Sequence, residues 1–366
     1  MSDREDFIPQ MRPLFGSEER EELLRYLDED GFFTEYKRTE AFEFEIARYT
    51  GAQHCVVVNN GTVSLTLAAL ALGVGPGDEV IVPNYTMIAT PNSIKLIGAK
   101  PVFVDVEPDT LVIDLELVKK AITRRTKAIM LVSANGRAPS AGIQEFEELS
   151  QKTGIPIIED AAQSLGSFYA DGRHIGLAGS IGSLSFSAPK IISTGQGGAL
   201  ITNDANLADK LRRLKDFGRA AGGTDVHDSI GYNFKFTELQ ACVGLAQMRK
   251  LPDRVERKKM IWCRYAQNLN GTSGLTLFKH NLNICVPWFI DCKVSRREEL
   301  TSHLINAGIG TRPMYPPINS QMAYQSPGSY PISTDIGKKG LWLPSLIQIT
   351  DKQIGQICNE IRSFFI

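Results

Sequence analysis

Short apolar runs that alternate with helical patterns dominate the first half of the chain. Each run is rich in Val or Ile, and each is followed by turn residues and then by an amphipathic segment. Runs of this kind are typical of parallel strands that are buried on both faces and connected by helices. The sequence therefore predicts an α/β fold with a mainly parallel sheet. The runs are His54–Val58, Glu79–Val82, Val102–Val106, Ala128–Val132, Ile155–Ile158 and Leu184–Phe186.

The pattern changes near Leu251, where the regular alternation of strands and helices ends. We therefore expect a large domain over residues 1–250, which includes an N-terminal helix at Glu18–Leu27, and a smaller α+β domain over residues 251–366. The elements expected in the smaller domain are a helix at Val255–Leu269, a strand at Ile284–Ile290, a helix at Arg296–Ala307, a loop region at Thr311–Pro331 and a helix at Asp351–Phe364.

The bulk properties exclude several classes of function. A formal net charge of -1 gives no general attraction to phosphate backbones, so nucleic-acid binding is not expected. The longest apolar segment, Leu65–Val74, is too short to span a membrane, and the polar start MSDREDFIPQM lacks a secretory signal pattern. The 6 cysteines form no CxxC pair and have no histidine partners at zinc spacing, so we expect small buried thiols and neither a disulfide framework nor a structural metal. We therefore expect a cytoplasmic protein.

One lysine, Lys190, lies in a turn just past an apolar run and is followed by a Thr-Gly-Gln-Gly-Gly loop. Such a position removes water from the amine, which favours the neutral, nucleophilic form. Upstream, the run that ends at Ile158 is followed by Asp160 and, three residues later, by Gln163. A carboxylate, an amide and an amine suit the ring nitrogen, the phenolate oxygen and the aldehyde of pyridoxal phosphate. The simpler alternatives are a solvated lysine, a helix-capping aspartate and an idle amide.

A possible anion site lies at Asn59-Asn60-Gly61-Thr62, which follows the first run and opens a helical pattern. Free N–H groups at a helix N-terminus and the Thr62 hydroxyl can hold an anion, and a simple N-cap is the alternative. Ser185, five residues before Lys190, could offer a second hydroxyl. The Gly195–Gly198 loop lacks the GK[ST] ending of a P-loop, and the 5 histidines show no metal-site or triad-like grouping.

Five segments of the chain match motifs of one enzyme family. They are NNGT, GDEVIVPNYTMIAT, IIEDAAQSLGS, SFSAPKIISTGQGGALITND and GYNFKFTELQACVGLAQM. On these segments the chain resembles the sugar aminotransferases of the DegT/DnrJ/StrS family, from about Leu14 to the C-terminus. The family has fold type I of the pyridoxal phosphate enzymes, so the resemblance implies a mainly parallel seven-stranded sheet in the large domain. It also implies transamination with pyridoxal 5'-phosphate, which passes through pyridoxamine phosphate.

The resemblance assigns roles around the cofactor ring. It implies that Lys190 is the Schiff-base lysine, that Asp160 faces the pyridine nitrogen and that Gln163 lies near the ring oxygen. The family usually has an aromatic residue stacked on the ring after the motif VPxxT. This chain has Met87 there, whose thioether can also cover a ring.

The resemblance also assigns the residues at the cofactor phosphate. It implies that Gly61, Thr62 and Ser185 hold this group. In the family an asparagine of the partner subunit reaches the same phosphate, and Asn233 of GYNFKF matches it. A homodimer with shared active sites follows from this match.

Within the family, the segments GTRPMYPP and YPISTDIGKKGLWLPS are most similar to the GDP-perosamine synthases. Those enzymes move an amino group from L-glutamate to C4 of GDP-4-keto-6-deoxy-D-mannose, a nucleotide-linked ketosugar. Arg312 and Tyr315 are then candidates for contacts with the sugar or the diphosphate, and loop packing is the alternative. Two further departures from the family pattern occur. Gln196 replaces the acid of TGEGG, which changes the electrostatics near Lys190. Residues 133–139 replace the family segment HLYGHPCDM of the sugar pocket, and this departure leaves the sugar open.

Three other functions remain open on the sequence. The first is amination, at C3 or C4, of another ketosugar linked to dTDP or UDP. The second is dehydration of a ketosugar, but related dehydratases have a histidine in place of the lysine, so Lys190 argues against it. The third is a non-catalytic regulator that binds cofactor or sugar nucleotide, against which Lys190, Asp160 and Thr62 argue together.

Overall fold

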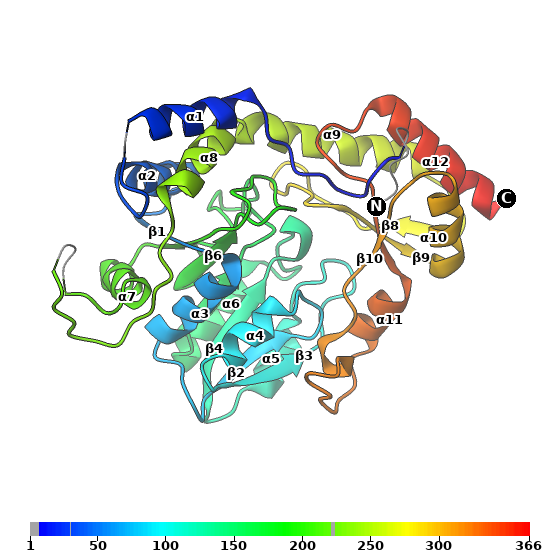
Figure 1. The fold of residues 1–366 in the computed structure, drawn as a ribbon. Coiled ribbons are helices and arrows are strands. Elements are labelled where there is room, and N and C mark those ends of the chain that lie inside the picture. The colour runs from blue at the N-terminus through cyan, green and yellow to red at the C-terminus, as the bar shows by residue number, and fades with distance from the viewer. Residues whose placement is uncertain (1–6, 30, 221–223) are drawn as a thin grey trace.

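The computed structural model describes residues 7–29, 31–220 and 224–366, and their fold is shown in Figure 1. The acidic start of the sequence, residues 1–6, lies outside the described residues. A seven-stranded sheet has the strand order β1-β7-β6-β5-β4-β2-β3, in which β7 is antiparallel to both neighbours and the other pairs are parallel. The predicted α/β class and mainly parallel sheet are confirmed. The strands are β1 (His54–Val58), β2 (Glu79–Pro83), β3 (Lys100–Val104), β4 (Thr126–Val132), β5 (Ile157–Asp160), β6 (Ile181–Ser185) and β7 (Gly198–Thr202).

Helices cover both faces of this sheet, because successive residues of each strand point to opposite sides. Val57 and Ile129 belong to the core on one side, whereas Val56 and Met130 belong to the core on the other. A further helix, α1 (Ser17–Asp28), packs on α8 at the outside. The first side is covered by α2 (Lys37–Thr50), α5 (Leu115–Ala121), α6 (Ile143–Thr153) and α8 (Glu238–Arg249), and the second by α3 (Gly61–Ala71), α4 (Ala89–Lys95) and α7 (Ala205–Lys215).

A second, antiparallel sheet with the order β10-β11-β9-β8 forms after residue 251. The long helix α9 begins at the expected domain boundary and connects the two sheets, as Figure 1 shows. Its Val255 packs in the core of the first sheet, and its Ile261 and Tyr265 pack in the core of the second. The elements are β8 (Leu275–Leu277), β9 (Ile290–Val294), β10 (Arg312–Pro313), β11 (Gly340–Leu343), α9 (Leu251–Leu269), α10 (Arg297–Asn306), α11 (Pro331–Lys339) and α12 (Asp351–Phe365).

The strand expected at Ile284–Ile290 is wrong, because the chain is irregular there and β9 begins only at Ile290. The N–H group of Val286 donates to the Ser167 hydroxyl at 2.9 Å, and Pro287 has no N–H group to offer a neighbouring strand. At the other end of the chain, Ile8 pairs with Ile309 and is buried. The first described residues therefore pack with the second sheet, although they were expected with the large domain.

A buried ion pair joins the two sheets. Arg137 follows β4, and its guanidinium Nη2 lies 2.8 Å from the carboxylate of Asp291 on β9, with both side chains at most 4% exposed. The Nε of Arg137 donates to the carbonyl of Thr110 at 2.8 Å, and its Nη1 lies 3.0 Å from Nε2 of His280. Burial alone would raise the pKa of Asp291, but the charge of Arg137 lowers this pKa well below the ordinary value. The pair therefore stays ionised and ties the loop after β4 to the second sheet.

We expect Arg137→Met to lower the free energy of unfolding by about 3–5 kcal/mol, because the variant leaves the Asp291 carboxylate buried without its partner. Denaturant unfolding measures this loss. Arg48→Met is the matched control, since Arg48 pairs with Glu45 within one helix at the surface and its removal should change the midpoint little. Equal midpoints for Arg137→Met and the wild-type protein would contradict the structural role given to this pair.

Candidate active site

A buried carboxylate ends the central strand of the first sheet. Asp160 is the last residue of β5 and is 6% exposed. Its Oδ2 accepts a hydrogen bond from the Thr90 hydroxyl at 2.8 Å, and Thr90 is bound in turn by the Thr86 hydroxyl at 2.8 Å. Burial raises the pKa of Asp160, while the Thr90 hydrogen bond and the charge of Lys190 lower it. The carboxylate is therefore held in one orientation at the carboxyl end of the parallel strands, where ligands bind in open α/β sheets.

The predicted amine lies beside this carboxylate. Lys190 is half-buried in the turn after β6, and its Nζ lies 4.3 Å from the ring centre of Trp288. The indole N–H of Trp288 donates to the carbonyl of Pro189 at 2.7 Å, which fixes the ring against the same turn. Burial lowers the pKa of Lys190 to about 8, with Asp160 opposing and Arg312 adding to this shift. Near neutral pH a useful fraction of the amine is therefore uncharged and nucleophilic.

A small pocket surrounds the Lys190 side chain. The amide of Gln163 forms part of its wall, and its Oε1 accepts from the backbone N–H of Asn135 at 2.7 Å. Ser185 and Trp288 line the same pocket, so the structure brings three predicted residues together and adds the indole. The full lining is Ala162, Gln163, Leu165, Ser185, Lys190, Ile191, Val286 and Trp288.

The predicted anion site adjoins this pocket. The Asn60 side chain caps α3 by accepting from the N–H of Val63 at 2.9 Å, so the N-cap interpretation is also correct. A Cβ atom on Gly61 would lie 2.9 Å from the Ser185 hydroxyl, so only glycine lets the helix begin this close to the end of β6. Thr62 is the next residue of the helix. The helix N-terminus and two hydroxyl-bearing residues thus converge on one place.

The second sheet contributes two of the predicted residues. Arg312 lies on β10 and its guanidinium is 5.5 Å from the ring centre of Trp342. The Tyr315 ring meets the same indole edge-on at 4.8 Å. The pKa of Tyr315 is raised by burial, with the charge of Asp160 adding to the shift. Arg312 therefore lies close enough to Lys190, and Tyr315 close enough to Asp160, for electrostatic interaction. Tyr315 also packs the loop, which is the alternative expected from the sequence.

Met87 and Asn233 are not part of this group within one chain. Met87 is 45% exposed, and its sulfur accepts from the N–H of Ala89 in its own turn at 3.0 Å. Asn233 is exposed on a segment that pairs with Asp216. The next residue, Phe234, accepts from the N–H of Asn59 at 3.2 Å, so this segment passes beside the start of α3.

Three residues that contribute to the site were missed by the sequence analysis. Thr90 orients Asp160, and its position four residues after Thr86, at the start of α4, was the signal that could have found it. Asn135 and Trp288 gave no local signal, because their partners lie about 30 to 150 positions away in the sequence. Their roles depend on how the two sheets pack.

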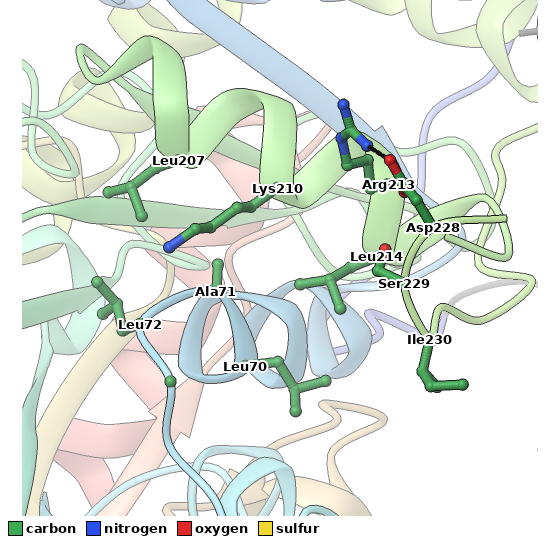
Figure 2. A pocket seen from close by; sticks show the side chains of 11 residues that line it. Leu70, Ala71, Leu72, Leu207, Lys210, Arg213, Leu214, Asp228, Ser229 and Ile230 are labelled. Atoms are coloured by element: carbon green, nitrogen blue, oxygen red, sulfur yellow. Dashed lines mark hydrogen bonds and ion pairs between the residues drawn. The ribbon is translucent and has the colours of Figure 1, made fainter. Parts of the chain in front are cut away.

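A larger pocket lies elsewhere, on the outside of the first sheet. It has a volume of about 630 Å³ and lies between α7 and the end of α3, as Figure 2 shows. Leucines of both helices line it, and the Arg213–Asp228 ion pair lies at its edge at 2.5 Å. None of the predicted site residues lines this pocket, so its size does not mark the chemistry.

Within residues 7–29, 31–220 and 224–366, no three His, Cys, Asp or Glu side chains are grouped so as to hold a metal ion. No helix in the described part of the chain is long and apolar enough to cross a membrane.

Comparison with known proteins gives a consistent result. The DegT/DnrJ/EryC1/StrS aminotransferase family matches residues 15–362. A GDP-perosamine synthase of Escherichia coli O157:H7 is 35% identical over 364 residues, which are 98% of this chain and 99% of that protein. DesV of S. venezuelae, solved in complex with a ketimine intermediate, has a TM-score of 0.89 at 33% identity, covering 97% of this chain and 98% of that chain. Streptococcus pneumoniae Spr1654 in its PLP form has a TM-score of 0.91 at 26% identity, covering 98% of each chain.

We expect amine acylation of Lys190 in the ligand-free protein to follow a pH profile with a midpoint of about 8, because only the neutral amine reacts. Asp160→Asn removes a charge that favours the ammonium form, so the midpoint should fall. Arg312→Met removes a charge that disfavours it, so the midpoint should rise. Peptide mass spectrometry after labelling at a series of pH values measures all three. Midpoints near the ordinary lysine value of about 10.4 in all three proteins would refute the environment given to Lys190.

Proposed function

The chain belongs to the DegT/DnrJ/EryC1/StrS aminotransferase family, and on this premise we propose that it uses pyridoxal 5'-phosphate to move an amino group from L-glutamate to a nucleotide-linked ketosugar. The membership confirms the transaminase class predicted from the sequence. The observation that carries the proposal is the placement of Lys190 near enough to Asp160 for their charges to interact, in a pocket that Gln163 and Ser185 also line and that adjoins the start of α3. An amine, an acid and an anion site are the three groups that this cofactor requires.

The residues of the site fit the cofactor group by group. Lys190 would bond to its aldehyde, Asp160 would hold a proton on its ring nitrogen, and Gln163 would donate to its ring oxygen. The close approach of Gly61 to Ser185 leaves the α3 N-terminus open toward the pocket, where the phosphate would bind. Spr1654 has been solved in a PLP and a PMP form, which supports this assignment.

Thr62 would add its hydroxyl at the phosphate, and Met87 would cover the ring face. Asn233 would reach the phosphate of a partner subunit in a homodimer. Its exposure on an extended segment supports this role. The exposed apolar residues Phe33 and Ile230, at 55% and 83%, give such a partner a surface to cover.

When bound, the cofactor accepts the electron pair that is left as a Cα–H bond of the amino donor breaks. The protein moves the proton. Lys190 Nζ, once released from the cofactor aldehyde, would take the proton from Cα of glutamate and give it to the former aldehyde carbon of the cofactor. The lowered pKa of Lys190 keeps this amine available as a base near neutral pH. Thr90 holds the Asp160 carboxylate in place throughout, because its hydroxyl is already bound to Oδ2.

The finer proposal is that the acceptor is GDP-4-keto-6-deoxy-D-mannose, aminated at C4 to give GDP-perosamine. The E. coli relative of that name, similar over nearly the whole chain, supports it. Arg312 and Tyr315 would contact the diphosphate or the sugar, since Arg312 interacts electrostatically with Lys190 and Tyr315 with Asp160. A ketosugar linked to dTDP or UDP is the alternative acceptor.

The glutamate half-reaction tests the general proposal. The protein loaded with pyridoxal phosphate should convert glutamate to 2-oxoglutarate in a single turnover without any sugar, because the amino group stays on the cofactor. Lys190→Ala should slow this turnover by at least about 100-fold, the size of a lost general base. Release of 2-oxoglutarate that requires the sugar to be present at the same time would contradict the two-step scheme.

A screen of acceptors tests the finer proposal. The protein loaded with pyridoxamine phosphate should aminate GDP-4-keto-6-deoxy-D-mannose in preference to dTDP- and UDP-linked ketosugars, as followed by product mass. Arg312→Met should raise the KM for the sugar by about 10- to 100-fold and leave the KM for glutamate nearly unchanged, as expected for a lost hydrogen bond to a charged group. A preferred dTDP or UDP sugar would refute the GDP assignment, and a product without added nitrogen would indicate a dehydratase.

A further inference from the structure

The loop after β4, in which this chain departs from the family segment, contains a backbone turn of unusual geometry. Asn135 has φ 55° and ψ 31°, in the left-handed region, and is only 3% exposed. Asparagine adopts this conformation more readily than other residues with a side chain, apart from aspartate. The side chain therefore points into the protein from a tight turn between the two sheets.

The Asn135 side chain binds both backbone groups of one residue before β9. Its Oδ1 accepts from the N–H of Phe289 at 2.7 Å, and its Nδ2 donates to the carbonyl of Phe289 at 2.9 Å. Because one partner can only donate and the other can only accept, the orientation of this amide is fixed by chemistry. The Asn135 turn is thus tied to the second sheet.

The backbone of Asn135 makes a third contact, to the Lys190 pocket. Its N–H donates to Oε1 of Gln163 at 2.7 Å. This bond occupies the carbonyl end of the Gln163 amide, so the NH2 end is the one left for a ligand. A donor at this place suits an anionic ring oxygen.

Asn135 is connected to two residues that line the Lys190 pocket, Gln163 and Trp288. It binds Gln163 directly, and it reaches Trp288 through Phe289. Phe289, which Asn135 binds, stacks on Trp288 with ring centres 3.8 Å apart. Trp288 in turn lies 4.3 Å from Lys190 Nζ. Asn135 therefore sets the distance between the donor amide and the indole that covers the reactive amine.

We propose that Asn135 is a positioning residue that turns the NH2 group of Gln163 toward the cofactor and fixes it relative to Trp288 and Lys190. The inference rests on the proposed function, because the partner of Gln163 is the ring oxygen of the bound cofactor. Such a donor stabilises the more negative, deprotonated state of the bound cofactor. Losing it raises the pH at which the cofactor absorbance titrates.

The test is the midpoint of this pH titration in the holoprotein, compared in two backgrounds. Gln163→Ala should raise the midpoint by about one pH unit, the size expected for a lost hydrogen bond to a charged group. Asn135→Gly keeps the backbone turn and removes the clamp to Phe289, so it should raise the midpoint in the wild-type background. In the Gln163→Ala background, Asn135→Gly should add no further shift.

A matched control separates positioning from stability. Asn84 is a buried asparagine whose Oδ1 accepts from the N–H of Asn319 at 2.8 Å, which also joins distant parts of the chain. Asn84→Ala should lower the thermal midpoint and leave the absorbance titration unchanged. If Asn135→Gly behaves like this control, or shifts the titration equally in both backgrounds, the inference is wrong.

The experiment also keeps the two proposals apart. A wild-type protein that binds no cofactor would refute the proposed function, whereas a normal wild-type titration with no dependence on Asn135 would refute only the inference. If Asn135→Gly does not fold, Asn135→Ser removes the double hydrogen bond to Phe289 with a smaller loss of side chain. The same comparison in two backgrounds then applies, with the same expected result.

Discussion

The site depends on the removal of water from one amine beside a buried carboxylate. Because β5 and β6 are parallel neighbours, Asp160 at the end of one and Lys190 after the end of the other meet at the same edge of the sheet. Burial favours the neutral amine, and the carboxylate opposes this shift without cancelling it. The helix N-terminus at Gly61 reaches the same edge, since no side chain keeps it away from Ser185. Reactive amine, acid and anion site therefore follow from one topology.

The first sheet alone does not complete the pocket. Trp288 covers Lys190 from the segment that leads into the second sheet, and Arg312 and Tyr315, on and after β10, interact electrostatically with Lys190 and Asp160. The position of this wall is fixed by contacts across the two sheets, namely the Arg137–Asp291 pair and the continuous helix α9. Small shifts between the sheets would change the cover over the amine, so packing far from the chemistry has a direct effect on the Lys190 environment.

The sequence predicted what local patterns encode. The α/β class, the approximate positions of six of the seven strands of the first sheet and the long helices followed from periodicity. Lys190, Asp160, Gln163 and Gly61 could be named as candidates because strand ends and helix starts are local features. The strand expected at Ile284–Ile290 was wrong, because the hydrophobicity of this segment reflects packing of Val286 and Trp288 between the sheets. Asn135 and Arg137 could not be predicted either, since each finds its partner about 150 residues away.

The most direct test of the central claim is reduction of the loaded protein with borohydride, followed by digestion and peptide mass spectrometry. The reagent makes a carbon–nitrogen bond between lysine and cofactor permanent. We expect the phosphopyridoxyl mass on the peptide that contains Lys190, because this amine alone combines a lowered pKa with the carboxylate of Asp160 and the α3 N-terminus. The same mass on another lysine, or on no peptide at all, would contradict the account.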